Sequence, residues 1–247
     1  MRTFGLIGYP LAHSFSKKFF TEKFQEEGIA GHQYELFPIE NIAAVVSLIA
    51  ADDSLSGLNV TIPHKVDVMA YLNELDPAAE TIGAVNCISI QHQDGKTWLK
   101  GYNTDAYGFQ ESLRPYLKKH HTHALILGDG GAAKAVKYVL DQLQLTYLSV
   151  VRSAAPDAIL YSELTAEIFQ QYQVIINTTP LGTFPNIEAA PAIPYEWITD
   201  QHLAYDLVYN PEETEFLKRA KAKGAAIKNG FEMLQLQAER SWFIWNP

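Results

Sequence analysis

Short runs of consecutive hydrophobic residues alternate along this chain with longer segments in which hydrophobic residues recur every three or four positions. The short runs predict buried β-strands, and the longer segments predict helices that each bury one face. Strands that alternate with helices are typical of the α/β class, in which a mostly parallel sheet is covered by helices. The sequence shows no internal repeats and no low-complexity tract.

In the first half, this pattern predicts strands at residues 4–8, 34–38, 55–60, 84–90 and 98–101, and helices at 17–27, 41–50, 66–72 and 106–117. Asn86 is unusual within its predicted strand, because asparagine is depleted in strands. It indicates either a bulge or side-chain-to-backbone bond, or a contact with a ligand. Asp94-Gly95 predicts a hairpin turn between the last two strands.

In the second half, strands are predicted at residues 123–127, 146–151, 174–182 (ending in a polar turn), 203–209 and 225–227, with helices through 143, at 214–223 and from 230 to about 245. Four hydrophobic residues of the last helix form a stripe that predicts core packing: Met233, Leu236, Phe243 and Ile244.

The composition is that of an ordinary globular protein. With 247 residues, 47% of them hydrophobic, the chain suffices for one large domain or two smaller ones. A net charge of −9 argues against nucleic-acid binding, which needs a basic surface. Any anionic ligand must therefore be held by local donors.

The sequence also indicates the cellular compartment of the protein. Cys87 is the single cysteine, which excludes an intrachain disulfide and fits a reducing environment. The sequence shows no hydrophobic run of membrane-spanning length, and residues 1–4 do not resemble a signal peptide. We expect a soluble, cytoplasmic protein.

Three polar stretches carry candidate chemistry. Residues 59–65 place the Asn59 amide, the Thr61 hydroxyl and the Lys65 amine at a predicted strand-to-helix junction. A lone lysine there is more often a surface residue, so the residues around Lys65 decide between a surface role and a functional one. Ser14 and Ser16 offer hydroxyls at a helix start, where free N–H groups suit a carboxylate, although one of them is expected to cap the helix. His13 is a possible ligand or base, but is more simply structural.

The third stretch is Asn103-Thr104-Asp105, at the start of another predicted helix. Alone, Asp105 is an ordinary partner of the helix dipole.

A dinucleotide site is indicated more specifically. The strand at 123–127 runs into Gly128-Asp129-Gly130-Gly131-Ala132-Ala133 and then a helix. This GxGxxA arrangement holds a pyrophosphate at a helix N-terminus. The next strand ends in Val151-Arg152-Ser153, without an acid for the ribose of NAD. A guanidinium and a hydroxyl suit the 2′-phosphate of NADP.

Together these segments resemble the shikimate dehydrogenase family. The resemblance covers nearly the whole chain and rests on residues 13–16, 59–65, 83–86, 103–105, 128–133, 177–182, 209–211 and 233–237. It implies reversible, NADPH-dependent reduction of 3-dehydroshikimate to shikimate, in chorismate and aromatic amino-acid biosynthesis. It also implies a substrate-binding domain at 1–104 and 230–247, a Rossmann NADP-binding domain at 105–229, and a last helix that returns to the first domain.

The resemblance further assigns the sites. Lys65 and Asp105 would be catalytic, an ammonium at Lys65 supplying a proton and positive charge to a developing alkoxide while Asp105 holds it. The formal proton donor of the pair is left open. No metal is expected. Substrate contacts would come from Ser14, Ser16, Asn59, Thr61, Asn86, Tyr209 and Gln237, and cofactor contacts from Gly128, Gly130, Gly131, Ala132, Arg152, Ser153, Thr178 and Gly230.

The chain departs from the family pattern at several positions. Lys17 and Phe20 replace a usual proline and a common histidine, and Thr183 replaces a common methionine near the nicotinamide. Asp129 in the glycine loop is expected to weaken cofactor binding by repulsion, and Val151 removes a hydrogen bond on the adenosine side. These changes bear on the cofactor more than on the substrate.

Three alternatives stay open. A quinate/shikimate dehydrogenase using NAD is disfavoured because no acidic residue follows Val151 to bind the ribose. A methylene-tetrahydrofolate dehydrogenase is disfavoured because it does not explain the pair Ser14 and Ser16. A catalytically silent binding protein on this fold is disfavoured by Lys65 and Asp105 together. The expected partner is a small-molecule substrate, without nucleic acid or membrane. Monomer and homodimer are both compatible with the sequence.

Overall fold

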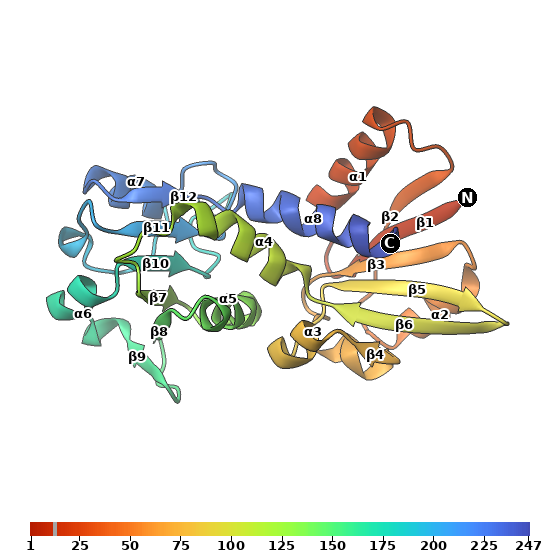
Figure 1. Ribbon diagram of the computed structural model, residues 1–247, viewed down its shortest axis with the longest axis horizontal. Helices are drawn as coiled ribbons and strands as arrows, with labels where there is room; N and C mark the ends of the chain where they lie inside the picture. The colour runs from red at the N-terminus through yellow and green to blue at the C-terminus, as the bar shows by residue number, and fades with distance from the viewer. Residues whose placement is uncertain (12–13) are drawn as a thin grey trace. The chain divides into compact units, whose positions relative to one another are not determined.

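The computed structural model describes residues 1–11 and 14–247 and divides the chain into two compact α/β units (Figure 1). The first unit comprises Met1–Thr104 and Ala238–Pro247, and the second comprises Asp105–Gln237. The second unit therefore extends beyond residue 230, where the return to the first domain was predicted. That the units carry separate substrate and cofactor roles stays a prediction here.

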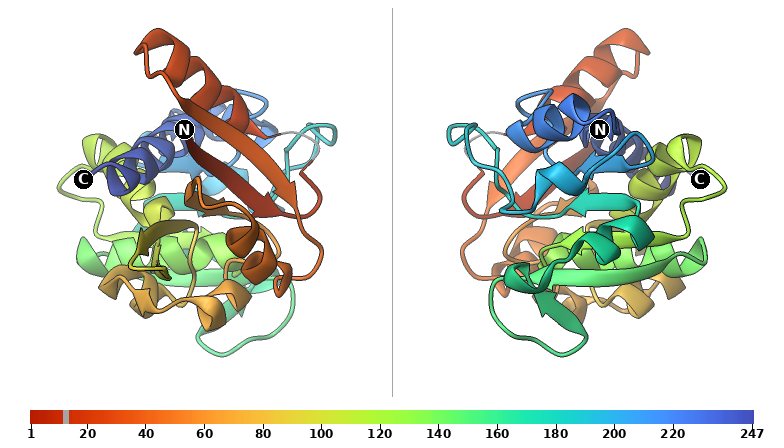
Figure 2. Two further views of the ribbon diagram at one scale, coloured as in Figure 1. Left: turned by 90° about the vertical axis from the view of Figure 1, so that its right-hand side faces the viewer. Right: turned by 90° about the vertical axis from the view of Figure 1, so that its left-hand side faces the viewer.

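The sheet of the first unit has the strand order β2-β1-β3-β5-β6-β4 among the described residues. Strands β1, β2 and β3 are parallel, whereas β5 runs antiparallel to both β3 and β6. Helix α1 packs against β1 and β2 (Figure 2). The elements are β1 (Arg2–Gly8), α1 (Phe15–Glu26), β2 (His32–Pro38), α2 (Ala44–Ala51), β3 (Leu55–Val60), the 3₁₀ helix η1 (Asp67–Tyr71), β4 (Glu74–Leu75), α3 (Pro77–Ile82), β5 (Cys87–Gln93) and β6 (Lys96–Tyr102).

The described strands of the second unit are all parallel, in the order β12-β11-β10-β7-β8-β9. Buried Leu125, Ile175 and Ala204 of the central strands form part of its core. The elements are α4 (Thr104–Leu113, its first residue in the first unit), η2 (Arg114–Tyr116), β7 (His123–Leu127), α5 (Gly131–Gln142), β8 (Thr146–Val151), β9 (Ala158–Leu160), η3 (Tyr161–Glu163), α6 (Ala166–Gln171), β10 (Val174–Asn177), η4 (Tyr195–Trp197), β11 (Leu203–Asp206), α7 (Glu215–Ala222), β12 (Ala226–Lys228) and the beginning of α8 (Phe231–Trp245).

The end of α8 belongs to the core of the first unit. The Trp245 indole N–H donates to the Ile88 carbonyl at 2.9 Å, and its ring stacks on Phe4 with centroids 4.9 Å apart. A Cβ at Gly57 would collide with the Trp245 ring. Gly57 therefore lets the indole lie directly against β3.

Several expected elements differ from the observed ones. The strand predicted at 84–90 begins at Cys87, so Asn86 precedes it, and the helix predicted at 66–72 is the shorter 3₁₀ helix η1. The strand predicted at 203–209 ends at Asp206, and the helix predicted at 106–117 is α4 followed by η2.

The predicted hydrophobic stripe of the last helix is wrong at Phe243, which is 60% exposed. Instead, buried Ala238, Ser241 and Trp245 face the first unit's core. These three residues recur at helical spacing, but the serine among them hides the pattern from a hydrophobic count. Within the described residues, no helix is both long and apolar enough to cross a membrane.

Candidate active site and cofactor pocket

Lys65 lies in a turn at residues 62–66, called the Lys65 turn below, which follows β3 in the first unit. The Lys65 carbonyl accepts the Val85 N–H at 2.7 Å. Buried His64, one residue earlier, donates through Nε2 to the Ile39 carbonyl at 2.7 Å. The backbone is thus held from two directions, and the half-buried Lys65 side chain starts from a fixed position. This turn joins β3 to the 3₁₀ helix η1, so Lys65 lies at the predicted junction, which leads into a 3₁₀ helix and not into the longer helix that the sequence predicted.

A buried polar network surrounds Asn59 at the end of β3. Its Oδ1 accepts the Tyr34 hydroxyl at 2.8 Å, and its Nδ2 donates to Ser241 Oγ at 2.9 Å and to the Asn86 carbonyl at 3.3 Å. Burial raises the pKa of Tyr34 well above its usual value, and a hydrogen bond with Ser16 opposes this rise. The network therefore connects Tyr34 of β2 with Asn59 and Ser241.

Asn86 lies between this network and the start of α4. Its Oδ1 accepts the Thr104 N–H at 2.6 Å, and its Nδ2 donates to Thr104 Oγ1 at 2.9 Å. Thr104 Oγ1 is also 3.2 Å from Ser241 Oγ. Of the alternatives for this asparagine, the structure shows the side-chain-to-backbone bond.

Two further predicted substrate residues, Ser14 and Thr61, lie in this unit. Ser14 is the N-cap of α1 and accepts the Lys17 N–H at 3.3 Å, as expected for one of the two serines. Thr61 follows β3, and its N–H donates to the Ile7 carbonyl of β1 at 2.9 Å. His13 lies outside the described residues. The first unit thus holds Ser14, Ser16, Asn59, Thr61, Lys65 and Asn86.

The remaining predicted residues of the reaction site belong to the second unit. Asp105 lies in the first turn of α4, and Gln237 is buried on α8 with its Nε2 donating to the Leu234 carbonyl at 2.9 Å. A Cβ at Gly108 would collide with the Met233 carbonyl and approach Gln237 within 3.1 Å. Gly108 therefore allows α4 and α8 to pack closely. Tyr209, 40% exposed, follows β11.

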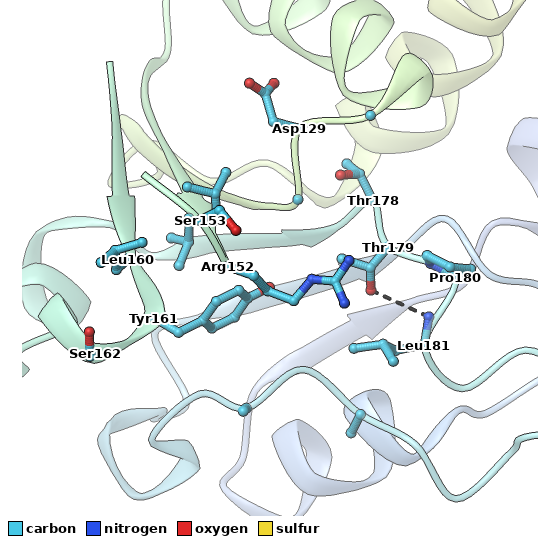
Figure 3. A pocket seen from close by; sticks show the side chains of 16 residues that line it. Asp129, Arg152, Ser153, Leu160, Tyr161, Ser162, Thr178, Thr179, Pro180 and Leu181 are labelled. Atoms are coloured by element: carbon cyan, nitrogen blue, oxygen red, sulfur yellow. Dashed lines mark hydrogen bonds between the residues drawn. The ribbon is translucent and has the colours of Figure 1, made fainter. Parts of the chain in front are cut away.

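A cavity of about 810 Å³ lies at the carboxyl ends of the second unit's strands (Figure 3). Of the eight predicted cofactor residues, five line it. They are Gly128, Gly130, Arg152, Ser153 and Thr178.

The glycine loop fits a dinucleotide. Gly128 has φ +100°, which favours glycine, and its N–H donates to the Val150 carbonyl at 2.9 Å. A Cβ at Gly130 or Gly131 would meet no atom within 4 Å, so the backbone at the start of α5 is open to a close ligand. The first N–H groups of a helix favour bound phosphates. The sequence-predicted pyrophosphate site therefore has a suitable cradle.

The wall opposite the loop was not predicted. Tyr161 lies beside Arg152 in the pocket, and Leu160 and Ser162 continue this wall (Figure 3). Burial raises the pKa of Tyr161, while the positive charge of Arg152 lowers it. The strand β9 that carries Leu160 is only three residues long, so it gives little periodic signal.

Three predicted cofactor residues do not line the cavity: Gly131, Ala132 and Gly230. Gly230 is buried, donates its N–H to the Val208 carbonyl at 3.1 Å, and has no room for a Cβ because of Leu207. The structure thus shows a packing role for Gly230, and its contact with the cofactor stays a prediction. No group of side chains within the described parts of the chain is arranged to hold a metal ion.

Comparison with known proteins identifies the family. Residues 6–88 match the family model described as the shikimate dehydrogenase substrate binding domain. The chain is 35% identical to a shikimate dehydrogenase (NADP(+)) of Desulforamulus reducens, over 98% of this chain and 88% of the relative. It is 37% identical to the enzyme of that name from Methanococcus maripaludis, over 98% and 90%.

A solved structure agrees. The shikimate 5-dehydrogenase of Thermus thermophilus, solved in complex with NADP(H) and shikimate, superposes with a TM-score of 0.85 at 30% identity, covering 100% of this chain and 94% of that one. The chain belongs to the shikimate dehydrogenase family.

Proposed function

We propose that this protein catalyses the reversible, NADPH-dependent reduction of 3-dehydroshikimate to shikimate, in chorismate and aromatic amino-acid biosynthesis. The observation that carries the proposal is the cavity in which Arg152 and Ser153 face a glycine loop at a helix N-terminus. A guanidinium and a hydroxyl at the end of the second Rossmann strand suit the 2′-phosphate of NADP. The NADP-dependent enzymes to which the chain is related support the same cofactor.

The substrate half of the proposal rests on the first unit. Ser14 and Ser16, at the start of α1, would hold the substrate carboxylate through hydroxyls and helix N–H groups. The ring hydroxyls would be bound by Asn59, Thr61 and Asn86, with Tyr209 and Gln237 completing the contacts. Asn59 and Asn86 would do so while fixed by their hydrogen bonds to Ser241 and Thr104.

For the reaction, a nicotinamide cofactor bound in the second unit's cavity would supply the hydride. Lys65 donates a proton to the alkoxide oxygen and places positive charge beside it, which lowers the barrier because this charge develops in the transition state. Asp105 orients the Lys65 ammonium. The two bonds that hold the Lys65 turn reduce the reorganisation needed for this transfer.

The single cysteine, Cys87, is buried in β5, so the chain has no intrachain disulfide. A protein without disulfides suits a reducing compartment, and we place the reaction in the cytoplasm. Fractionation of the native organism's cells, followed by detection of the protein in the soluble cytosolic fraction, tests this placement.

A spectrophotometric assay tests the function. Purified protein should reduce NADP with shikimate far faster than it reduces NAD with shikimate, or either cofactor with quinate. Comparable rates with quinate and NAD would support the alternative dehydrogenase. A folded protein that binds shikimate and NADP but gives no turnover in either direction would support the binding protein instead.

A further inference from the structure

The glycine loop contains an acid, Asp129, at the place where a dinucleotide brings its negatively charged pyrophosphate. Placed near a phosphate, a carboxylate repels it, and we expected weaker cofactor binding for this reason. The structure shows a compensating arrangement. Lys137 Nζ lies 2.6 Å from Asp129 Oδ1, forming an ion pair between the loop and helix α5.

The direction of the carboxylate matters as much as its charge. Figure 3 shows the Asp129 carboxylate directed away from Arg152 and Tyr161. The Lys137 side chain is 27% exposed and that of Asp129 is 36% exposed, so the pair is partly shielded from solvent.

Lys137 lies on the second turn of α5, eight residues after Asp129. The ion pair therefore spans the glycine loop and ties it to the helix whose N-terminus faces the cavity. Gly130 and Gly131 between them are conformationally permissive and provide no side chain to fix the loop. An ion pair across this segment limits where the carboxylate can turn.

We propose that Lys137 is a positioning residue for the cofactor: it neutralises Asp129 and turns its carboxylate away from the pyrophosphate position, so that the loop accepts a dinucleotide. Lys137 does not itself bind the phosphates in this proposal. The inference rests on the proposed NADP-dependent function. It also explains how the chain tolerates an acid that the glycine-loop chemistry disfavours.

Calorimetric titration with NADP⁺ tests the proposal. Lys137→Gln should raise the dissociation constant by about three- to thirty-fold, the effect of one uncompensated charge near a protein surface. Asp129→Asn should bind as tightly as wild type or more tightly. In the double variant Lys137→Gln/Asp129→Asn, affinity should return to within about two-fold of wild type, because neither charge remains.

The double variant separates the possible roles. If Lys137 bound the phosphates directly, Lys137→Gln would weaken binding as much in the Asp129→Asn background as in the wild-type background, which would overturn the proposal. If the ion pair only supported the fold, Asp129→Asn alone would weaken binding as much as Lys137→Gln does, which would also overturn it. Lys218→Gln, at an exposed position of α7, is the matched control for loss of one positive charge and should bind like wild type.

Two fragments localise the effect. ADP contains the pyrophosphate, whereas adenosine 2′-monophosphate contains only the phosphate expected at Arg152. Lys137→Gln should weaken ADP binding and leave 2′-monophosphate binding within about two-fold, and equal losses would overturn the proposal. If wild-type protein failed to bind NADP⁺ at all, the proposed function would fail; if it bound and Lys137→Gln bound equally well, only this inference would fail.

Discussion

Asn86 caps helix α4 from outside the helix: its Oδ1 accepts the N–H of Thr104 at 2.6 Å. The Asn86 Nδ2 donates to the Thr104 hydroxyl at 2.9 Å, and both residues are buried. The first N–H groups of a helix lack partners within it, so this side chain satisfies one of them. Because Asp105 follows Thr104, the contact fixes the backbone immediately before a proposed catalytic residue.

Asn86→Ala should therefore affect both stability and turnover. Losing the cap leaves buried polar groups of Thr104 without this partner, which should lower the free energy of unfolding by about 1–3 kcal/mol in urea titrations. The kcat should also fall, because the backbone just before Asp105 is no longer held by the Asn86 side chain. Thr104→Val keeps the N–H bond and loses the hydroxyl's contacts with Asn86 and Ser241, so its loss of kcat should be smaller. Equal losses in the two variants would argue against the backbone cap.

Substitutions of Ser14 and Ser16 should differ in whether they change the free energy of unfolding as well as shikimate binding. Ser16→Ala should weaken shikimate binding by about 0.5–1.5 kcal/mol, the contribution of a hydrogen bond. Ser14→Ala should in addition lower the free energy of unfolding by about 1 kcal/mol, because Ser14 is the N-cap of α1. Calorimetry measures the first and denaturant titration the second. An unchanged shikimate Kd in Ser16→Ala would reject the carboxylate contact.

Asp206 should make stability depend on pH. This fully buried carboxylate accepts from Asn177 Nδ2 at 2.9 Å and from Thr214 Oγ1 at 2.5 Å, yet burial raises its pKa from 3.8 to about 6. The folded state then holds the proton more tightly than the unfolded state. The resulting stability is present below about pH 4 and is lost as the pH rises through about 6.

Asp206→Asn removes this titration. The variant should gain about 2–3 kcal/mol relative to wild type between about pH 4 and pH 7.5, since each pKa unit corresponds to about 1.4 kcal/mol. Taking the difference between two pH values cancels any constant effect of the altered hydrogen bonds. Urea titrations of both proteins at each pH measure it. Parallel pH profiles of the two proteins would contradict a raised Asp206 pKa.

The sequence predicts the local features of the fold well. Strand β7, just before the glycine loop, has four consecutive hydrophobic residues, β3 and β8 are rich in hydrophobic residues, and Gly128 and Gly130 stand where a tight turn needs them. These signals are contained within a few neighbouring residues. For the same reason, the position of the cofactor pocket follows from the sequence, down to Arg152 and Ser153.

Features that depend on distant residues were not predictable. Asn86 looked like an odd strand residue because its partner, Thr104, is 18 positions away. Asp129 looked unfavourable because nothing in the loop indicates that Lys137 would fold back onto it. The buried face of α8 was misjudged because Ser241 is polar, although hydrogen bonds to Asn59 and Thr104 make its burial favourable.

Arg152→Ala should separate the two cofactors. Arg152 lines the pocket beside Tyr161, at the end of β8. If it binds the 2′-phosphate, its loss should raise the KM for NADP far more than the KM for NAD, which lacks that group. A charge-assisted hydrogen bond contributes about 1.5–3 kcal/mol, so the NADP-to-NAD ratio should shift about ten- to hundred-fold. Equal changes in both KM values would refute the assignment.

Lys65→Ala distinguishes an enzyme from a binding protein. The substitution removes the proton donor and the positive charge together, and general acid catalysis contributes about 10²- to 10⁴-fold, so kcat should fall by that factor. Shikimate affinity should change much less, because the charge is needed most when the alkoxide develops. Asp105→Asn should also lower kcat, and the kcat of the double variant should fall by less than the product of the two effects, since the pair acts as one unit.

Lys65→Arg is the matched control, because it keeps the charge but donates a proton poorly at neutral pH. It should bind shikimate like wild type and still turn over slowly. If Lys65→Ala stays folded and keeps kcat within a few-fold of wild type, another group supplies the proton and the proposed mechanism is wrong.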